Sequence, residues 1–441
     1  MVSSAREFSI GPPKVDPIEW TVQGRAKGGK AVNNKTAGTE QHTYRPTAFR
    51  PPLRSGFPQR RLRFAHTRPQ GENVSPTRRD FLQTSAGALG AVTVGGALQK
   101  AAAITLPVAP TVRPMRILVL GGTGFIGPYV VRYALYRGHT VSIFNRGRSK
   151  PDLFPEVEKL VGDRDGALDA LRGKEWDAVI DNTGYVPRHV RDSCELLKGH
   201  VGRYLFTSTG SVYQGDRDAI DEDSPLLAVE EPEREDWQQY YGPLKVLCEQ
   251  ISQEVYGPQC TIVRPHVVAG PEDSTNRFSY WPVRIDHGGE VIGPGDPNDP
   301  VQYIDVRDLS EFMVHLVERD TAGVYNGAGP YLGDTPMAQL LYGCRAVTTS
   351  DVSFTWIDKE FLKEREANFQ LWYALFDAFR GFSHVSIRRA VAAGLTNRPI
   401  AVTAHDTLEW LKAQSQERQA EVQLNLERDK KILEEWHAAK G

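Results

Sequence analysis

Cysteine is scarce in this sequence, with four residues among 441 and none of them in a C-x-x-C pair. Structural zinc sites and dithiol redox centres rely on closely spaced cysteines, so neither is indicated and we expect no metal chemistry. A small scaffold stapled by disulfides is excluded as well, because a chain of this length, 40% hydrophobic, can bury a large core without them.

Long, strongly apolar runs are also missing. One stretch without charge lies between Asp80 and Lys100, but it is rich in Gly and Ala rather than in Leu and Ile. Such a composition is too weakly apolar to hold a bilayer span firmly, so we expect no stable membrane span.

The net charge is close to zero, at −2, but it is unevenly distributed. Residues 1–80 carry 15 Lys and Arg against 6 Asp and Glu, which leaves a negative balance of 11 on the rest of the chain. An acidic body repels phosphate backbones at long range, so nucleic acid is not an expected partner.

Residues 1–76 contain nine prolines, many arginines and no sustained apolar period. A segment of this kind cannot repay the entropy that is lost on folding. We predict a disordered, basic, proline-rich extension.

The next segment, residues 77–110, begins Thr-Arg-Arg-Asp-Phe-Leu-Gln and continues into the uncharged stretch. It resembles a twin-arginine export signal, with a departure at Gln83, where lysine is common. The resemblance implies the twin-arginine translocase as a partner during export, and a periplasmic or otherwise exported product. A disordered basic linker in front of a soluble domain is the alternative.

The position of this signal bears on where translation starts. Such signals begin near the start of a chain, yet 76 residues precede Thr77, so we expect translation to begin near Val74 and cleavage to follow Ala103. Initiation at Met115, directly before the first predicted strand, would instead give a cytoplasmic protein without a signal.

From Arg116 onward, apolar strands alternate with amphipathic helices. The predicted strands are RILVLG, TVSIFN, EKLVGD, WDAVIDN, RYLFTST and TIVRPHVVAGP. This alternation is typical of an α/β fold with a doubly wound parallel sheet, covered on both faces. We predict a nucleotide-binding domain over 113–270, a smaller C-terminal substrate-binding subdomain over 271–403 that interleaves with it, and a C-terminal helix over 404–441.

A glycine-rich loop joins the first strand to the first helix. Glycines allow a tight turn and the close approach of a pyrophosphate, whose charge the helix N-terminus stabilises. A glycine trio alone is weak evidence, but between a strand and a helix it indicates dinucleotide binding. The predicted binding residues are Gly121, Thr123, Gly124, Phe125, Ile126 and Gly127.

The second strand ends at Asn145 and Arg146, where an NAD-specific site usually supplies an acid for the ribose. Arg146 and Arg148 could receive a 2′-phosphate instead, which favours NADP(H) over NAD(H), although both could equally be solvated loop arginines. Asp163, after the third strand, is placed to meet the adenine edge.

Tyr241 and Lys245 stand four residues apart in a predicted helix, so both lie on one face. They follow a strand that ends in TSTGSVY, whose hydroxyls would lie at the carboxyl edge of the sheet. Together with GGTGFIG, RPHVVAGP and YIDVRDL, this combination resembles the extended short-chain dehydrogenase/reductase superfamily, the NAD-dependent epimerase/dehydratase group, over about residues 115–330.

The resemblance implies a Rossmann domain and a set of roles. Tyr241 would be the general acid/base, Lys245 would lower the pKa of the tyrosine and hold the nicotinamide ribose, and Thr209 would bind the reacting oxygen. Asp181 and Asn182 depart from the small-residue or histidine pattern that is commoner at these positions. The residues expected to line the nicotinamide and its ribose are Asn182, Thr183, Pro265 and His266.

Substrate contacts are expected from residues 277–284, RFSYWPVR, where the family builds the lid over its substrate. Arginines with interleaved aromatic residues suit a polar, sugar-like or anionic small molecule, although an amphipathic packing helix explains the tryptophan as well. The substrate candidates are Tyr213, Arg277, Trp281 and Arg284, with Gln302 and Arg307 placed similarly.

Two classes of function follow. The first is an NAD(P)-dependent oxidoreductase, epimerase or dehydratase that acts on a hydroxyl or carbonyl carbon of a small molecule. A homodimer is one assembly that this class could form. The motifs do not separate net reduction from epimerisation. The second is a non-catalytic nucleotide-binding relative that acts as an RNA-binding or assembly factor. The acidic body and the complete set of Thr209, Tyr241 and Lys245 favour the first.

Overall fold

The computed structural model describes residues 113–329 and 335–441. The predicted basic extension, 1–76, and the predicted signal and linker, 77–110, lie outside the described residues. Within the described ranges, no helix is both long enough and apolar enough to cross a membrane.

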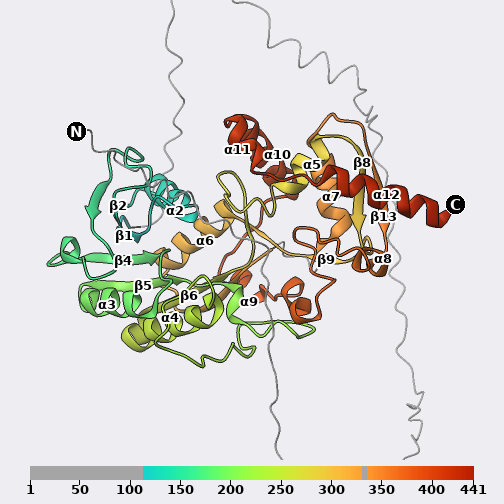
Figure 1. Ribbon diagram of the computed structural model, residues 1–441. Coiled ribbons are helices and arrows are strands. Elements are labelled where there is room, and N and C mark those ends of the chain that lie inside the picture. The colour runs from blue at the N-terminus through green and yellow to red at the C-terminus, as the bar shows by residue number, and fades with distance from the viewer. Residues whose placement is uncertain (1–112, 330–334) are drawn as a thin grey trace, which may run out of the picture. The chain divides into compact units, whose positions relative to one another are not determined.

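A seven-stranded sheet dominates residues 116–327, and every pairing in it is parallel. Its order is β11-β6-β5-β4-β1-β2-β3 (Figure 1). The strands are β1 (Arg116–Leu120), β2 (Thr140–Asn145), β3 (Glu158–Val161), β4 (Trp176–Asp181), β5 (Val201–Thr207), β6 (Cys260–Pro265) and β11 (Gly323–Gly327). The chain runs outward from β1 to β3 and then returns to place β4 beside β1. Ligands of such sheets bind at this reversal, outside the carboxyl ends of the strands.

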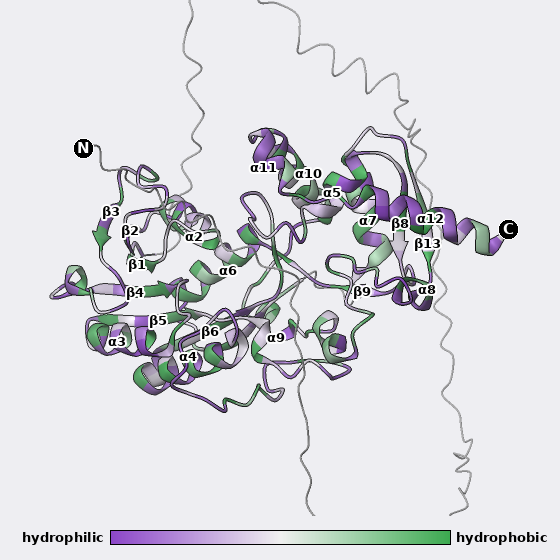
Figure 2. Cartoon of the chain, viewed as in Figure 1, coloured by the Kyte–Doolittle hydropathy of each residue, from purple (hydrophilic) through white to green (hydrophobic). Residues whose placement is uncertain are grey.

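Helices cover both faces of the sheet. They are α2 (Ile126–Tyr136) and α6 (Val306–Glu318) on one face, and α3 (Pro187–Leu197) and α4 (Tyr241–Tyr256) on the other. Because side chains of a strand alternate between faces, Ile117 and Val119 join the core under α2 and α6, whereas Leu118 and Leu120 join the core under α3 and α4. Figure 2 shows hydrophobic and hydrophilic residues alternating around α3 and α4. The predicted doubly wound sheet is confirmed.

A second, smaller core lies in the C-terminal part, around the buried rings of Trp281 and Trp372. Two parallel strands and several helices enclose it. These elements are α5 (Tyr280–Asp286), β8 (Gly289–Pro294), α7 (Met337–Arg345), β13 (Val352–Ile357), α10 (Ile400–Lys412) and α12 (Leu426–Lys440). The predicted smaller C-terminal unit is therefore present beside the sheet.

Residues 404–441 were predicted as one helix, but in the structure they are divided among three helices. Between α10 and α12 lies α11 (Gln416–Ala420), which Ser415 starts because its side chain accepts a hydrogen bond from the Arg418 N–H. A capping serine of this kind interrupts the helical pattern that the charged composition suggested.

One strand of the sheet, β11, was not predicted. Its sequence, GVYNG, is short and contains two glycines and an asparagine, which strands usually avoid, so only its pairing with β6 defines it. The remaining short elements are β7 (Val268–Ala269), β9 (Pro300–Val301), β10 (Ile304–Asp305), β12 (Thr335–Pro336), α8 (Lys359–Lys363), α9 (Arg388–Ala392) and the 3-10 helices Asp169–Leu171, Gly210–Val212, Gly257–Gln259 and Asp377–Ser383.

Candidate active site

The glycine-rich loop between β1 and α2 is packed too tightly for side chains. Gly121 has a φ of +87°, and a Cβ atom there would lie 2.1 Å from Thr183 Cγ2. A Cβ atom on Gly127 would lie 2.2 Å from the Gly121 carbonyl oxygen, whereas Gly124 faces open space. α2 follows Phe125 without a side-chain cap, so its first N–H groups are available to a pyrophosphate. These features fit a dinucleotide.

At the end of β2, Asn145 ties the strand to the glycine-rich loop. Its Nδ2 donates to Thr123 Oγ1 over 3.2 Å, and its Oδ1 accepts from the Gly147 N–H over 2.8 Å. Arg146 and Arg148 beside it are both exposed. Their binding of a 2′-phosphate stays a prediction.

The residues after β3 form a turn that anchors a buried network. Asp163 Oδ1 accepts from the Asp165 N–H over 3.2 Å. Arg164, which the sequence analysis did not single out, is buried and donates two hydrogen bonds of 2.6 and 2.8 Å to Asp181, at the end of β4. Tyr204 donates a third, of 2.6 Å, to the same carboxylate. Asp181 is therefore fully engaged within the protein.

Buried polar atoms at the carboxyl edge that have no hydrogen-bond partner among the described residues include Asn182 Nδ2, after β4, and Ser208 Oγ, after β5. The amide of Asn182 is oriented by Thr207, whose Oγ1 donates to its Oδ1 over 2.7 Å. A buried donor without a partner is costly, so a polar ligand group at this edge would satisfy it. The ribose and carboxamide of a nicotinamide are groups of that kind.

His266, which follows Pro265 at the end of β6, is partly buried and neutral at neutral pH. Burial lowers its pKa to about 4, and its Nδ1 accepts from the Val267 N–H over 2.8 Å. Its ring packs edge to face against Phe382, with the ring centroids 5.8 Å apart. A neutral imidazole here offers a ligand a flat surface rather than a positive charge.

Thr209, Tyr241 and Lys245 come together at the same edge. Thr209 caps the 3-10 helix Gly210–Val212, and its side chain hydrogen-bonds with Tyr241, the first residue of α4. Lys245, one turn later, is buried, and its Nζ donates to the carbonyl oxygens of Gly184 over 2.8 Å and Thr207 over 2.6 Å. These contacts fix the ammonium group between β4 and β5.

Burial shifts both titratable groups of this set. It lowers the pKa of Lys245 to about 8, against the raising influence of Cys248 and Asp181. It raises the pKa of Tyr241, against a hydrogen bond from Thr209 and the charge of Arg277. The family resemblance implied that Lys245 lowers the tyrosine pKa. In the structure, Thr209 and Arg277 have that effect, and the lysine is directed to two carbonyl groups.

One predicted substrate residue, Arg277, lies close enough to Tyr241 and His266 for its charge to affect both. It is half-buried. Its Nε donates to Thr275 Oγ1 over 3.2 Å, and its side chain hydrogen-bonds with Tyr373. Arg277 therefore remains a candidate for contact with the substrate.

Trp281 and Arg284 are structural instead. Trp281 is completely buried, and its Nε1 donates to the Gln370 carbonyl oxygen over 2.8 Å. The guanidinium of Arg284 donates to the carbonyl oxygens of Gly288 and Glu290, over 3.0 and 2.6 Å. Both side chains hold the second core together.

Tyr213 and Gln302 are also occupied within the protein. The Tyr213 hydroxyl donates to Asn326 Oδ1 over 2.7 Å and accepts from Arg264 over 2.8 Å, in a side chain that is 1% exposed. Gln302 exchanges two hydrogen bonds with the backbone of Val385. Neither residue is available to a substrate.

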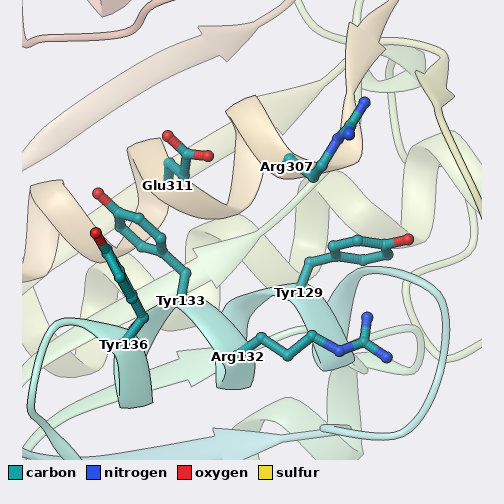
Figure 3. Close-up of a pocket in the computed structure, with 6 residues that line it drawn as sticks. All are labelled: Tyr129, Arg132, Tyr133, Tyr136, Arg307 and Glu311. Atoms are coloured by element: carbon teal, nitrogen blue, oxygen red, sulfur yellow. The ribbon is translucent and has the colours of Figure 1, made fainter. Parts of the chain in front are cut away.

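Arg307 lies away from the catalytic set, where it pairs with Asp305 over 2.7 Å and with Asp406. It borders a hollow of about 210 Å³ between α2 and α6 (Figure 3). The lining residues are Tyr129, Arg132, Tyr133 and Tyr136 on α2, and Arg307 and Glu311 on α6. None of the residues that line this hollow belongs to the catalytic set.

Two aromatic residues were not predicted: Tyr185, whose ring lies beside that of Tyr241, and Trp237, whose ring packs on Tyr185. Tyr185 follows β4, and its ring centroid lies 6.3 Å from that of Tyr241 and 4.9 Å from that of Trp237. The only sequence signal for Tyr185 was a tyrosine shortly after the end of a predicted strand. No local pattern connects Tyr185 to Trp237.

Comparison with protein families gives two matches. The model of the NAD dependent epimerase/dehydratase family matches residues 117–328, and that of the ubiquitinol-cytochrome C reductase Fe-S subunit TAT signal matches residues 69–99. The second match covers the segment that resembles a twin-arginine signal.

Curated relatives are similar over less than half of this chain. A 2-alkyl-3-oxoalkanoate reductase of Stenotrophomonas maltophilia is 28% identical, with 45% of this chain and 64% of that protein covered. The chloroplast stem-loop binding protein of 41 kDa b of Arabidopsis thaliana is 25% identical, with 48% and 58% covered. A UDP-glucose 4-epimerase of Erwinia amylovora is 27% identical, with 43% and 60% covered. The chain thus spans about three fifths of the length of these relatives.

Among similar solved structures is a UDP-galactose 4-epimerase, which is 17% identical in sequence and has a TM-score of 0.47. The match covers 68% of this chain and 99% of that chain. A dTDP-glucose 4,6-dehydratase from Bacillus anthracis is 14% identical with a TM-score of 0.49, with 70% and 100% covered. Residues 117–328 match the model of the NAD dependent epimerase/dehydratase family, which confirms the resemblance drawn from the motifs of this segment.

Proposed function

We propose that this protein is an NAD(P)-dependent enzyme of the extended short-chain dehydrogenase type. Its substrate carries a hydroxyl or carbonyl group on the carbon that gives or receives a hydride. The observation that carries the proposal is the contact of Thr209 with Tyr241 at the carboxyl edge, one helical turn from the buried Lys245. Relatives named as a reductase, a 3-beta-hydroxysteroid dehydrogenase and an epimerase support it.

The cofactor is held from both ends. In this proposal the uncapped N-terminus of α2 and the packed glycine-rich loop receive the pyrophosphate, the unpartnered Asn182 Nδ2 meets the nicotinamide ribose, and Lys245 binds the same ribose in addition to its two carbonyl contacts. The bound nicotinamide supplies the hydride acceptor or donor. We further propose NADP(H) as the preferred form, because β2 ends without an acid and two exposed arginines, Arg146 and Arg148, follow it.

Tyr241 exchanges the proton. Burial keeps its pKa above the usual value, so the phenol is protonated at neutral pH and can donate to a substrate oxygen during reduction. The Thr209 hydroxyl, which already contacts Tyr241, is placed to bind the same oxygen. In the oxidation direction the hydrogen bond from Thr209 and the charge of Arg277 stabilise the phenolate.

The purified full chain offers a direct test. The protein is denatured, and the released small molecules are identified by mass spectrometry together with their redox state. We expect NADP(H) or NAD(H) in near-stoichiometric amount. Absence of dinucleotide, both as purified and after incubation with it, combined with retention of RNA at physiological salt, would instead support the RNA-binding class.

We also propose export through the twin-arginine route, supported by the family match at residues 69–99. That route carries folded proteins, and a nicotinamide dinucleotide is made in the cytoplasm. An enzyme that folds around its cofactor before export would therefore leave the cytoplasm with the cofactor in place.

A further inference from the structure

Aromatic rings from three separate segments contact residues of the proposed active site: one ring packs beside Tyr241, a second packs on that ring, and the rings of the third segment reach His266. Tyr185 comes from the loop after β4, and Trp237 from the loop before α4. The third segment, residues 373–382, contributes three more rings, those of Tyr373, Phe379 and Phe382.

The third segment connects two residues of the site, His266 and Arg277, through its rings. The Phe382 ring packs against His266, and Phe379 packs against Phe382 with centroids 5.6 Å apart. Tyr373 lies 6.4 Å from Phe379 by ring centroid and hydrogen-bonds with Arg277. These contacts therefore lead from His266, on the proposed nicotinamide side, to Arg277, whose charge acts on Tyr241.

Backbone contacts fasten this segment in place. The Gly381 N–H donates to the Gly215 carbonyl oxygen over 2.9 Å, and the Ile220 N–H donates to the His384 carbonyl oxygen over 3.1 Å. Gly215 leaves room for the aromatic cover, because a Cβ atom there would lie 2.2 Å from Phe382 Cε2. The rings therefore sit where the main chain holds them.

The chemistry of this enclosure is mainly apolar. Rings bury apolar surface favourably, whereas hydroxyl groups pressed against them lose hydrogen bonds to water without replacement. The polar groups along these contacts are the hydroxyls of Thr209 and Tyr241 for the reacting oxygen, the guanidinium of Arg277, the neutral imidazole of His266 and the hydroxyls of Tyr185 and Tyr373, the last of which is already engaged with Arg277.

We propose that the substrate body is a flat, apolar ring system that stacks between these aromatic side chains, with one anionic or oxygen-bearing substituent directed at Arg277. This inference rests on the proposed function and names its substrate class. It replaces the polar, sugar-like molecule that the arginines of residues 277–284 suggested, since of the two arginines in that segment only Arg277 has a charge that acts on Tyr241.

Aryl ketones test the proposal on the dinucleotide-loaded full chain. Binding of acetylnaphthalene, propanone and UDP-glucose is measured by calorimetry, and oxidation of NADPH and NADH is followed with the two ketones. We expect acetylnaphthalene to bind at least about tenfold more tightly than either other probe. Phe379→Ala should cost about tenfold in that affinity, and Phe379→Leu, which keeps an apolar side chain and guards against misfolding, should cost less.

Two controls make the result specific. Tyr342→Ala removes an exposed ring on α7 and should leave binding unchanged. Acetylbenzoate should bind more tightly than acetylbenzene, and Arg277→Met should remove the difference. Equal or tighter binding of UDP-glucose, or an unchanged affinity in both Phe379 variants, would overturn the inference. Aryl-ketone binding without hydride transfer would leave the inference standing and count against the proposed function, so the two failures are distinguishable.

Discussion

Lys245 on α4 donates a hydrogen bond of 2.6 Å to the carbonyl oxygen of Thr207, the last residue of β5. This contact joins the helix that carries Tyr241 to the sheet edge that carries Thr209. The ammonium is buried, and burial lowers its pKa to about 8. Its protonation therefore changes close to neutral pH.

If Lys245 binds the ribose as proposed, affinity for the dinucleotide should fall as the pH rises through about 8, because the ammonium then loses its charge. Its folded pKa lies below the usual 10.5, so between these values the unfolded chain binds more protons and this group makes the free energy of unfolding rise with pH. Loss of affinity in that window is therefore not unfolding caused by Lys245. Calorimetric titration of NADPH between about pH 7 and pH 10 measures the step.

Lys245→Met has no ammonium to lose, so it should bind the dinucleotide weakly and without a step near pH 8. A step of unchanged size in this variant would mean that another group titrates.

Arg146→Asp should shift the preference from NADPH towards NADH. A carboxylate repels the 2′-phosphate and accepts hydrogen bonds from the ribose hydroxyls. We expect the ratio of kcat/KM for the two cofactors to fall by about tenfold or more. Arg172→Asp, at another exposed arginine, is the matched control and should leave the ratio unchanged. A parent protein that already prefers NADH contradicts this account of the loop.

Arg164→Met should destabilise the fold, since it leaves the buried carboxylate of Asp181 without its cation. Breaking a buried pair in this way costs about 3–5 kcal/mol in the free energy of unfolding. Arg172→Met breaks an exposed pair with Asp169 and should change stability little. Denaturant unfolding of both variants and the parent protein measures the difference. If Arg164→Met is as stable as Arg172→Met, the buried pair does not contribute to the free energy of unfolding.

The part of the site that the sequence predicted is the part defined by local spacing. The glycine-rich loop lies between neighbouring elements, and Tyr241 and Lys245 lie four residues apart on one helix. Their spatial relationship follows from the chain itself. The same holds for the alternation of strands and helices that indicated the parallel sheet.

The substrate residues that the sequence mispredicted have hydrogen-bond or ion-pair partners that lie far away in the chain. Arg284 has its guanidinium 3.6 Å from Asp429, on α12, and the Tyr213 hydroxyl donates to Asn326, on β11. No sequence pattern near residues 213 or 284 indicates that these side chains would contact Asn326 and Asp429. The aromatic cover of residues 373–382 reaches His266 for the same reason, through tertiary contacts that spacing does not encode.

Arg78→Lys combined with Arg79→Lys should retain the precursor in the cytoplasm with its cofactor bound. Twin-arginine transport depends on this pair, whereas a basic linker would tolerate lysine. Fractionation of cells, with sequencing of the N-terminus, measures the outcome. Periplasmic protein that starts near Ile104 supports export, and a cytoplasmic parent chain that starts at Met1 or Met115 contradicts it.

The central claim is that the Tyr241 hydroxyl exchanges the proton during hydride transfer, and Tyr241→Phe tests it most directly. The substitution removes one oxygen atom and little surface, so the dissociation constant for NADPH should stay within about threefold of the parent value. Turnover of an accepted ketone, followed by oxidation of NADPH, should fall by about 10²–10⁴-fold, the usual contribution of a general acid. Full activity in this variant with intact cofactor binding would contradict the account.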